Sequence, residues 1–477
     1  MKVASLPGID IHGVAYDSRR VQPGDVFIAL KGLKAAGTDF VDDAIRRGAV
    51  AVVSDEPGPA TSTVPWITVA DARGAMASLA AEFYGHPSRS MQVVGITGTN
   101  GKTTTAYLLR AVFDAAGKKC GLIGTVTYST GEQELPASRT TPEAPDVQRM
   151  FRQMVDAGCG ACVMEVSSHA LALRRVDGTT FAAGVFTNLT RDHLDYHGDM
   201  ESYFAAKQRL FEMLPAGAPG AINLDDPRGE TVRKATATPV TYAIHKPADV
   251  TPGPLTLTFD GLEFDARTPK GSVRVKSRLV GRPNVSNILA TVAVSTALGL
   301  PVAAIERGLA NLDGVPGRFE VVSDARDDIT VVIDYAHTDD ALKNLLETAR
   351  PLAQRRVITL FGCGGDRDRT KRPLMGAVAS RLSDVVVITS DNPRSEDPSR
   401  IIDEIRRGVP AASDRDDKTT VAIVDRKEAI EFAIKTAQPG DLVLLAGKGH
   451  EKSQSIGARD LPFDEADIAR RALERRR

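Results

Sequence analysis

A glycine-rich stretch at residues 93–105 constrains the fold of this chain more than any other part of its sequence. Its letters, Val-Val-Gly-Ile-Thr-Gly-Thr-Asn-Gly-Lys-Thr-Thr-Thr, predict a buried strand, a tight turn and the start of a helix. Glycines let such a turn curl and direct backbone N–H groups to the point that the helix N-terminus also faces, where phosphate binds. Lys102 would neutralise the terminal phosphates, and Thr103 or Thr104 would offer a hydroxyl to the accompanying magnesium ion.

The stretch is a variant of the P-loop pattern, because Ile96 stands where the general pattern has glycine. An ordinary glycine turn is disfavoured, because the lysine directly opens an amphipathic run with Leu108, Val112 and Ala116 on one face. The spacing of the glycines also differs from the G-x-G-x-x-G fingerprint of dinucleotide-binding folds. We therefore expect a site that binds the phosphates of a nucleotide.

Composition excludes several classes of protein. The formal net charge of the 477 residues is −1, which argues against a nucleic-acid partner. Residues 1–7 lack the apolar core of a signal peptide, and no apolar run approaches the ~20 residues that span a membrane. Four cysteines are too few for a disulfide framework, so we expect buried free thiols and a cytoplasmic protein without a membrane partner.

The chain reads as three α/β domains. We expect an N-terminal domain at 1–88, a central P-loop domain with a parallel sheet at 89–315, and a Rossmann-like C-terminal domain at 316–477, with boundaries at glycine- and proline-containing segments. Residues 240–280 predict short strands joined by turns, an excursion rich in β-structure within the central domain.

Charged side chains follow two predicted strands of the central domain. Glu165 lies near the end of an apolar strand, where open α/β sheets bind their ligands. Its partner would be magnesium, or alternatively Arg175 in a buried ion pair. A dense polar segment at 187–197 includes His193, and Lys207 follows on a predicted helix, where a solvated lysine is the default.

Four apolar strands of the C-terminal domain each lead into polar residues. These polar ends lie at 334–337, 362–368, 391–394 and 447–451. If the strands are parallel, their carboxyl ends meet at one edge of the sheet. The pattern therefore predicts a single crevice lined by all four ends.

Taken together, the motifs at 98–103, 165–169, 188–195, 334–337 and 447–451 resemble those of the Mur ligases, and the resemblance covers nearly the whole chain. It implies an ATP-dependent amide ligase of peptidoglycan precursor synthesis, acting through an acyl phosphate. Residues 364–367 and 391–394 are similar to the branch that adds meso-diaminopimelate, rather than L-lysine, to a UDP-N-acetylmuramoyl dipeptide. We expect such an enzyme to act as a monomer.

The resemblance also implies roles for individual residues. ATP would contact Gly98, Thr99, Asn100, Gly101, Lys102, Thr103, Thr104, Asn287, Arg318 and Asp334. The UDP-linked substrate would contact Ser18, Thr140, Thr141, Ser167 and Arg175. Magnesium would be held by Thr103, Glu165, His193 and Lys207, the lysine as a carbamate, and Lys102, His193 and Lys207 would be catalytic.

The pocket for the third amino acid would contain Arg367, Asp391, Asn392, Pro393, Arg394, Gly447 and Glu451. Meso-diaminopimelate carries a second carboxylate and ammonium, which lysine lacks as a pair. Arg394 would bind that carboxylate through two parallel hydrogen bonds, and Glu451 would accept from the ammonium.

Two alternatives stay open. The first is a relative in the same superfamily, either the lysine-adding ligase or a folylpolyglutamate synthase. The second is a P-loop ATPase that drives the assembly or regulation of a partner. An ATPase of that kind would hydrolyse ATP without a small-molecule acceptor.

Overall fold

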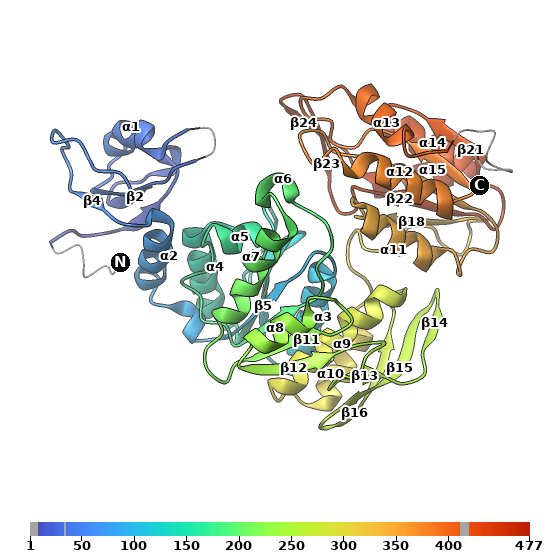
Figure 1. Ribbon diagram of the computed structural model, residues 1–477, viewed down its shortest axis with the longest axis horizontal. Coiled ribbons are helices and arrows are strands. Elements are labelled where there is room, and N and C mark those ends of the chain that lie inside the picture. The colour runs from blue at the N-terminus through green and yellow to red at the C-terminus, as the bar shows by residue number, and fades with distance from the viewer. Residues whose placement is uncertain (1–7, 33–34, 411–418) are drawn as a thin grey trace.

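The computed structural model describes residues 8–32, 35–410 and 419–477, and in it three α/β units follow one another along the chain (Figure 1). The N-terminal unit, in blue, and the C-terminal unit, in orange and red, lie on opposite sides of the central one. The predicted lack of a signal peptide concerns residues 1–7, outside the described range. The predicted three-unit α/β fold is confirmed, whereas the exact boundaries after residues 88 and 315 stay predictions.

The N-terminal unit is a small parallel sheet of strand order β1-β2-β3-β4. The connection between β1 and β2 contains a 3-10 turn at Ser18–Arg20. The helix α2 leads from this sheet toward the central unit. The elements are β1 (Gly13–Ala15), β2 (Asp25–Ala29), α1 (Val41–Arg46), β3 (Ala51–Ser54), β4 (Trp66–Thr68) and α2 (Ala72–Phe83).

An eight-stranded sheet of order β12-β11-β10-β5-β9-β6-β7-β8 organises the central unit. The strands from β12 to β6 are parallel, and β7 and β8 form an antiparallel edge. The elements are β5 (Gln92–Thr97), α3 (Lys102–Ala115), β6 (Cys120–Ile123), β7 (Thr127–Ser129), β8 (Glu134–Pro136), α4 (Ala144–Asp156), β9 (Ala161–Glu165), α5 (Ser168–Ala172), β10 (Ala183–Phe186), α6 (Leu194–His197), α7 (Met200–Glu212), β11 (Pro219–Asn223), α8 (Gly229–Ala235) and β12 (Thr238–Tyr242).

The predicted β-rich excursion is a second, antiparallel sheet beside the first. It pairs β15 with β13, β14 and β16, and two helices connect it to the next unit. These elements are β13 (Thr251–Pro252), β14 (Thr256–Thr258), β15 (Gly261–Thr268), β16 (Gly271–Ser277), α9 (Arg282–Ala297) and α10 (Val302–Asn311). The apolar face of α3, with Leu108 and Val112, is buried against this part of the chain, as its periodicity predicts.

The C-terminal unit contains a sheet of order β17-β18-β22-β19-β20-β21, parallel except at β17. The four predicted apolar strands are therefore parallel neighbours. The elements are β17 (Glu320–Val321), β18 (Thr330–Asp334), α11 (Asp339–Ala349), β19 (Val357–Phe361), α12 (Lys371–Leu382), β20 (Val385–Ile388), α13 (Pro398–Arg406), β21 (Thr419–Ala422), α14 (Arg426–Thr436), β22 (Leu442–Ala446), β23 (Ser453–Ile456), β24 (Arg459–Pro462) and α15 (Glu465–Arg476).

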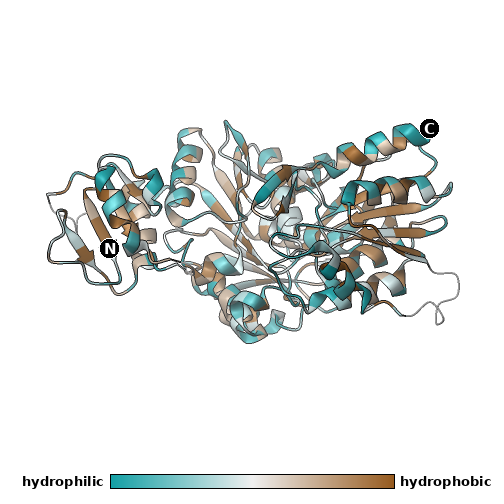
Figure 2. Ribbon diagram, turned by 90° about the horizontal axis from the view of Figure 1, so that it is seen from above, coloured by the Kyte–Doolittle hydropathy of each residue, from teal (hydrophilic) through white to brown (hydrophobic). Residues whose placement is uncertain are grey.

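Apolar strands form the cores, and Figure 2 shows them in brown between helices that carry much of the teal. The four cysteines are buried and free, as expected. We find no helix among the described residues that is long and apolar enough to cross a membrane.

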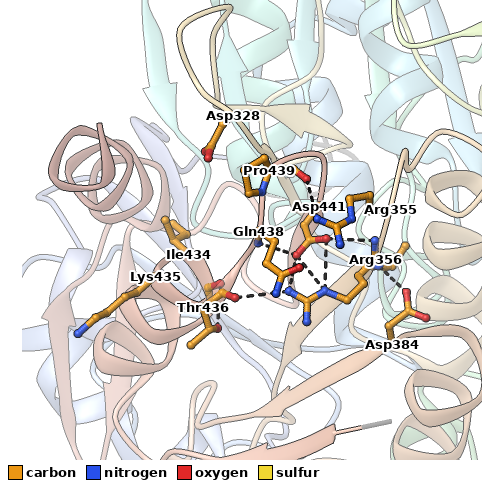
Figure 3. Close-up of polar contacts among 12 residues, drawn as sticks. Asp328, Arg355, Arg356, Asp384, Ile434, Lys435, Thr436, Gln438, Pro439 and Asp441 are labelled. Carbon is orange, nitrogen blue, oxygen red and sulfur yellow. Dashed lines mark hydrogen bonds and ion pairs between the residues drawn. The ribbon is translucent and has the colours of Figure 1, made fainter. Parts of the chain in front are cut away.

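A polar cluster lies at the amino-terminal ends of β19 and β22, at the edge of the sheet opposite the predicted crevice (Figure 3). The Asp441 side chain is fully buried, and it pairs with Arg356 at 2.6 Å and accepts from the backbone of Gln438. Burial opposes ionisation, but these hydrogen bonds hold the pKa of Asp441 below its ordinary value. A carboxylate with a lowered pKa stabilises the fold at neutral pH, and that contribution is lost as the pH falls.

We expect Arg356→Met to lower the free energy of unfolding at pH 7 by about 2 kcal/mol, because it leaves the buried carboxylate without its cation. The loss should shrink in acid, where Asp441 is protonated in the unfolded state. Urea denaturation at neutral and acidic pH measures both effects. Arg355→Met is the control, because its exposed side chain forms no ion pair among the described residues, and an equal loss in both variants would contradict the assignment.

Candidate active site

The P-loop begins where β5 ends at Thr97 and continues into α3 at Lys102, as predicted. Two of its glycines are required by their surroundings. A Cβ at Gly98 would lie 1.8 Å from the Thr187 hydroxyl, and one at Gly101 would lie 2.4 Å from Asn287 Oδ1. Both glycines also have positive φ, 147° and 88°. The loop can therefore approach its neighbours closely only because it lacks side chains at these positions.

Residues predicted to contact ATP come together at this loop from distant segments. Lys102 Nζ donates to the carbonyl oxygens of Gly98 and Thr99, both at 2.9 Å. Arg318, which precedes β18, reaches across and donates to Thr103 Oγ1 at 3.1 Å. Near Arg318, the Asp334 carboxylate accepts from the backbone of Phe319 at 2.7 Å.

Glu165 is the last residue of β9 and is 1% exposed. Its carboxylate accepts from Thr103 Oγ1 at 3.1 Å and from the backbone and hydroxyl of Thr125 at 2.8 and 2.9 Å. The alternative of a Glu165–Arg175 ion pair is wrong, because Arg175 pairs with Glu143 at 2.8 Å. The carboxylate thus lies at the start of the P-loop helix without a cationic partner among the described residues.

The default interpretation of Lys207 as a solvated side chain is wrong. The residue is 2% exposed, because α7 packs this face against the P-loop, and Nζ donates to Gly98 O at 2.8 Å. Nζ also lies 4.4 Å from the centre of the Tyr203 ring. Burial, with the nearby charge of Lys102, holds the pKa of Lys207 well below its ordinary value.

His193 lies beside this lysine in a cluster of aromatic rings. Its ring centre is 4.8 Å from that of His169, and Asp192 is 3.3 Å from its Nε2. Burial lowers the pKa of His193, and the cations Lys207 and Lys102 add to this effect while Asp192 opposes it. A neutral imidazole keeps a lone pair for a metal ion.

Whether these residues fit magnesium depends on Lys207. No group of three His, Cys, Asp or Glu side chains in the described part of the chain is arranged to hold a metal ion. The Thr103 and Glu165 oxygens are the hard donors that magnesium prefers. A carbamate on Lys207 would add the missing carboxylate, so the set fits the ion only with that modification.

Four of the five residues predicted for the UDP-linked substrate form one group in the central unit. Thr141 Oγ1 donates to Glu165 O at 2.9 Å and lies 3.2 Å from Ser167 Oγ. Arg175 donates to Thr141 O at 3.0 Å, and Thr140 Oγ1 is 3.1 Å from Thr125 Oγ1. The fifth residue, Ser18, is buried apart from them in the N-terminal unit.

Contacts between Tyr16 and Asp146 join the N-terminal unit to this region, with the phenol donating at 2.6 Å. A cavity of about 220 Å³ lies there, lined among others by Arg20 and Arg149. The two units thus share a polar junction beside the substrate group.

The four polar strand ends of the C-terminal unit lie at one edge of its sheet, as predicted. Arg367 follows β19, residues 391–394 follow β20, and residues 447–451 follow β22. Asn392 Nδ2 donates to Glu451 Oε2 at 2.9 Å. The fourth end, at 334–337, lies beside the end of β22, because Gly447 N donates to Asp334 O at 3.0 Å and the Tyr335 ring is 5.1 Å from that of His450.

Two arginines lie near each other at the more exposed end of this crevice, since a Cβ at Gly364 would be 2.9 Å from Arg394 Nη1 and 3.8 Å from Arg367 Cγ. Arg394 has a positive φ of 51° and donates to Gly365 O at 2.7 Å. Burial lowers the pKa of Arg394, and the charge of Arg367 lowers it further. Neither guanidinium forms an ion pair with a carboxylate of the described residues, so together they are suited to an anionic ligand.

The crevice also depends on residues that the sequence did not single out. Arg426 and Glu465, both fully buried, form an ion pair at 2.7 Å, and Arg426 donates to Ser390 O and Ala446 O. This pair therefore fixes the ends of β20 and β22. Lys448, also fully buried, lies beneath the same loops. Lys448 lies within the motif at 447–451, whereas no sequence pattern near Arg426 or Glu465 indicates that they support the crevice.

The two halves of the site face each other across the junction of the central and C-terminal units. Asn100 of the P-loop donates to Asp340 at 3.1 Å, and Arg191 pairs with Asp368 at 3.0 Å. A second cavity of about 370 Å³ lies along this junction, between β7–β8 and residues 449 and 450. The central and C-terminal units are therefore in direct contact beside the P-loop.

Comparison with known proteins agrees with this arrangement. Models of the Mur ligase family, catalytic domain, of the Mur ligase middle domain and of the Mur ligase, glutamate ligase domain match residues 10–84, 96–295 and 317–449. A protein of Geobacillus thermodenitrificans named UDP-N-acetylmuramoyl-L-alanyl-D-glutamate--2,6-diaminopimelate ligase is 48% identical, over 100% of this chain and 99% of its own. A protein of the same name from Solibacter usitatus is 48% identical over 98% and 94%.

Solved structures extend the comparison. A ligase structure with that same name has a TM-score of 0.67 and 34% identity, covering 98% of this chain and 95% of its own. The MurF ligase of Thermotoga maritima in complex with ADP has a TM-score of 0.68 at 20% identity, covering 98% and 100%, which bears on the fold alone.

Fold and site define an ATP-dependent ligase built on a P-loop domain. With relatives this similar over its full length, the chain belongs to the Mur ligase family.

Proposed function

We propose that this chain joins meso-diaminopimelate to UDP-N-acetylmuramoyl-L-alanyl-D-glutamate in peptidoglycan precursor synthesis. The observation that carries the proposal is the contact between the P-loop unit and the unit that holds Arg394 and Arg367, made by Asn100 with Asp340 and by Arg191 with Asp368. The names of the full-length relatives agree with it. ATP and a UDP-linked substrate are cytoplasmic metabolites, so the reaction belongs in the cytoplasm, and we expect a monomer to carry it out.

The reaction requires activation of a carboxylate. The D-glutamyl γ-carboxylate attacks the γ-phosphorus of ATP and ADP leaves, giving an acyl phosphate; the amine then attacks the acyl carbon and phosphate leaves. Lys102 and Arg318, at the P-loop, would stabilise the negative charge that gathers on the phosphates. Thr141, Ser167 and Arg175 would orient the dipeptide so that its carboxylate points at that phosphate.

Thr103, Glu165, His193 and a carbamylated Lys207 would hold magnesium. When bound, the ion would neutralise charge shared between phosphate and carboxylate oxygens. The carbamate forms when the neutral amine adds to carbon dioxide and releases a proton. The burial of Lys207 beside Gly98, without a carboxylate partner among the described residues, supports this modification.

Measurement of phosphate release tests the proposal. The assay contains ATP, magnesium and the UDP-muramoyl dipeptide, and either meso-diaminopimelate or L-lysine is added. We expect turnover with diaminopimelate alone, because lysine would leave Arg394 unpaired in its pocket. Turnover with lysine alone would keep the ligase and overturn the amino-acid assignment. Phosphate release that ignores both amino acids and the dipeptide would favour the ATPase alternative.

A further inference from the structure

Lys448 is a buried cation to which the proposed reaction gives no role. It lies two residues beyond β22, and its side chain is 0% exposed. Nζ donates to Asn392 Oδ1 and to Glu451 Oε2, both at 2.9 Å, and lies 3.6 Å from Asp391 Oδ1. A buried ammonium requires such partners, and all three belong to the predicted amino-acid pocket.

The first of these contacts fixes the orientation of the Asn392 amide. Its Oδ1 accepts from Lys448 Nζ and from the backbone of Ser455 at 3.0 Å, while its Nδ2 donates to Glu451 Oε2. A flipped amide would turn its NH₂ toward two donors and its oxygen toward a carboxylate. Lys448 therefore selects one of the two orientations.

The second contact leaves one carboxylate oxygen of Glu451 available. Oε2 accepts from both Lys448 and Asn392, whereas Oε1 has no hydrogen-bond partner among the residues that the structure describes. The Glu451 side chain is 30% exposed, so Oε1 can be reached from the crevice. An ammonium group is the ligand that this oxygen suits best.

The charges around Lys448 also indicate that Glu451 accepts an ammonium group. Lys448 is shared between Glu451 and Asp391, and the neighbouring cation Arg426 is already paired with Glu465. Two carboxylates thus share one ammonium at the buried end of the crevice, while Arg394 and Arg367, at its more exposed end, have no ion-pair partner among the described residues. The separation of charge matches an amino acid head with its ammonium inward and its carboxylate outward.

We propose that Lys448 is a positioning residue for the amino-acid substrate: it holds the Asn392 amide and the Glu451 carboxylate in the arrangement that accepts the distal ammonium. The inference rests on the proposed function, because it assumes an amino acid with a second head. Lys448 acts through its neighbours and does not touch the substrate itself.

Lys448→Met tests the proposal, with ATP, dipeptide and diaminopimelate varied in turn. We expect the KM for diaminopimelate to rise about 30-fold or more, since hydrogen bonds to two charged or polar partners are lost, while the KM for ATP stays within about twofold. Trapping of the acyl phosphate by hydroxylamine needs no amino acid, so hydroxamate formation should also be retained. Lys452→Met is the matched control, because that lysine is exposed and, within the described part of the chain, forms its ion pair with Asp464 alone.

A double-mutant cycle with Glu451→Gln adds a readout that a general loss of stability would not give. If Lys448 acts through Glu451, the double variant should bind diaminopimelate no worse than the poorer single variant. Lys448→Arg keeps the charge, so it should recover part of the affinity for diaminopimelate. If Lys448→Met does not fold, the KM values of Lys448→Arg and Lys448→Gln are compared instead.

Equal rises in the KM for ATP and for diaminopimelate, with loss of hydroxamate formation, would overturn the inference. Such a result would leave the proposed function intact, because the unaltered enzyme would still use diaminopimelate. If the unaltered enzyme itself releases no phosphate with diaminopimelate, the proposed function fails instead.

Discussion

Lys207→Ala is expected to lose ligase activity by roughly 100- to 1000-fold in kcat, with acetate or formate restoring part of it. The buried amine lies 2.8 Å from the P-loop carbonyl of Gly98, close to Lys102. As an ammonium it would repel a metal ion, and as a carbamate it would supply oxygen ligands. A small carboxylate can enter the space that the alanine leaves and replace those oxygens.

The measurement is phosphate release by Lys207→Ala and Lys207→Met with increasing acetate or with methylamine. The methionine variant fills the space, so it should be inactive and resist rescue while remaining folded. Full activity of the alanine variant without any additive would contradict the proposal that Lys207 is carbamylated. Rescue by methylamine in place of acetate would show that a cation, and not a carboxylate, is needed there.

Much of the fold could be predicted because its signals are local. The strand, glycine turn and helix at 93–105 are encoded within thirteen consecutive letters, and Asp397 followed by proline marks the start of α13. The four C-terminal strands alternate with helices, and such connections produce a parallel sheet. Convergence of their polar ends followed from that topology.

Side-chain partners could not be predicted in the same way. Arg426 and Glu465 are 39 residues apart in sequence, and nothing near either one indicates that both are buried. The sequence around Lys207 is typical of a surface helix, and the lysine is buried only because α7 packs on the P-loop. Arg175 forms its ion pair with Glu143 and not with Glu165. These outcomes depend on how separate elements pack, and helix or strand periodicity does not contain that information.

The resemblance filled part of this gap, but only at positions that a motif includes. It named Asn392 and Glu451 and passed over Lys448, although one ammonium joins the two. A motif identifies residues that recur, whereas the hydrogen bonds show which of them depend on one another. The amino-acid pocket is therefore better described as two layers, with charged groups at the crevice supported by buried cations beneath it.

Arg394→Ala should raise the KM for meso-diaminopimelate by roughly 100-fold or more and leave the KM for ATP nearly unchanged, because a charged bidentate contact is removed. The guanidinium is half-buried, lies beside Arg367 and has no carboxylate partner among the described residues. Arg394→Lys should recover only part of the affinity, since an ammonium cannot form two parallel hydrogen bonds.

Selectivity gives the sharper test of the same residue. In the unaltered enzyme, lysine leaves the half-buried guanidinium of Arg394 without an anion, and this penalty disappears when Arg394 becomes alanine. The ratio of kcat/KM for diaminopimelate over lysine should therefore fall toward one in Arg394→Ala. Arg400→Ala, an exposed arginine six residues further on, should keep both the KM and the ratio. Equal rises in the KM for ATP and for diaminopimelate, with the ratio unchanged, would mean that Arg394 supports the fold and does not bind the substrate.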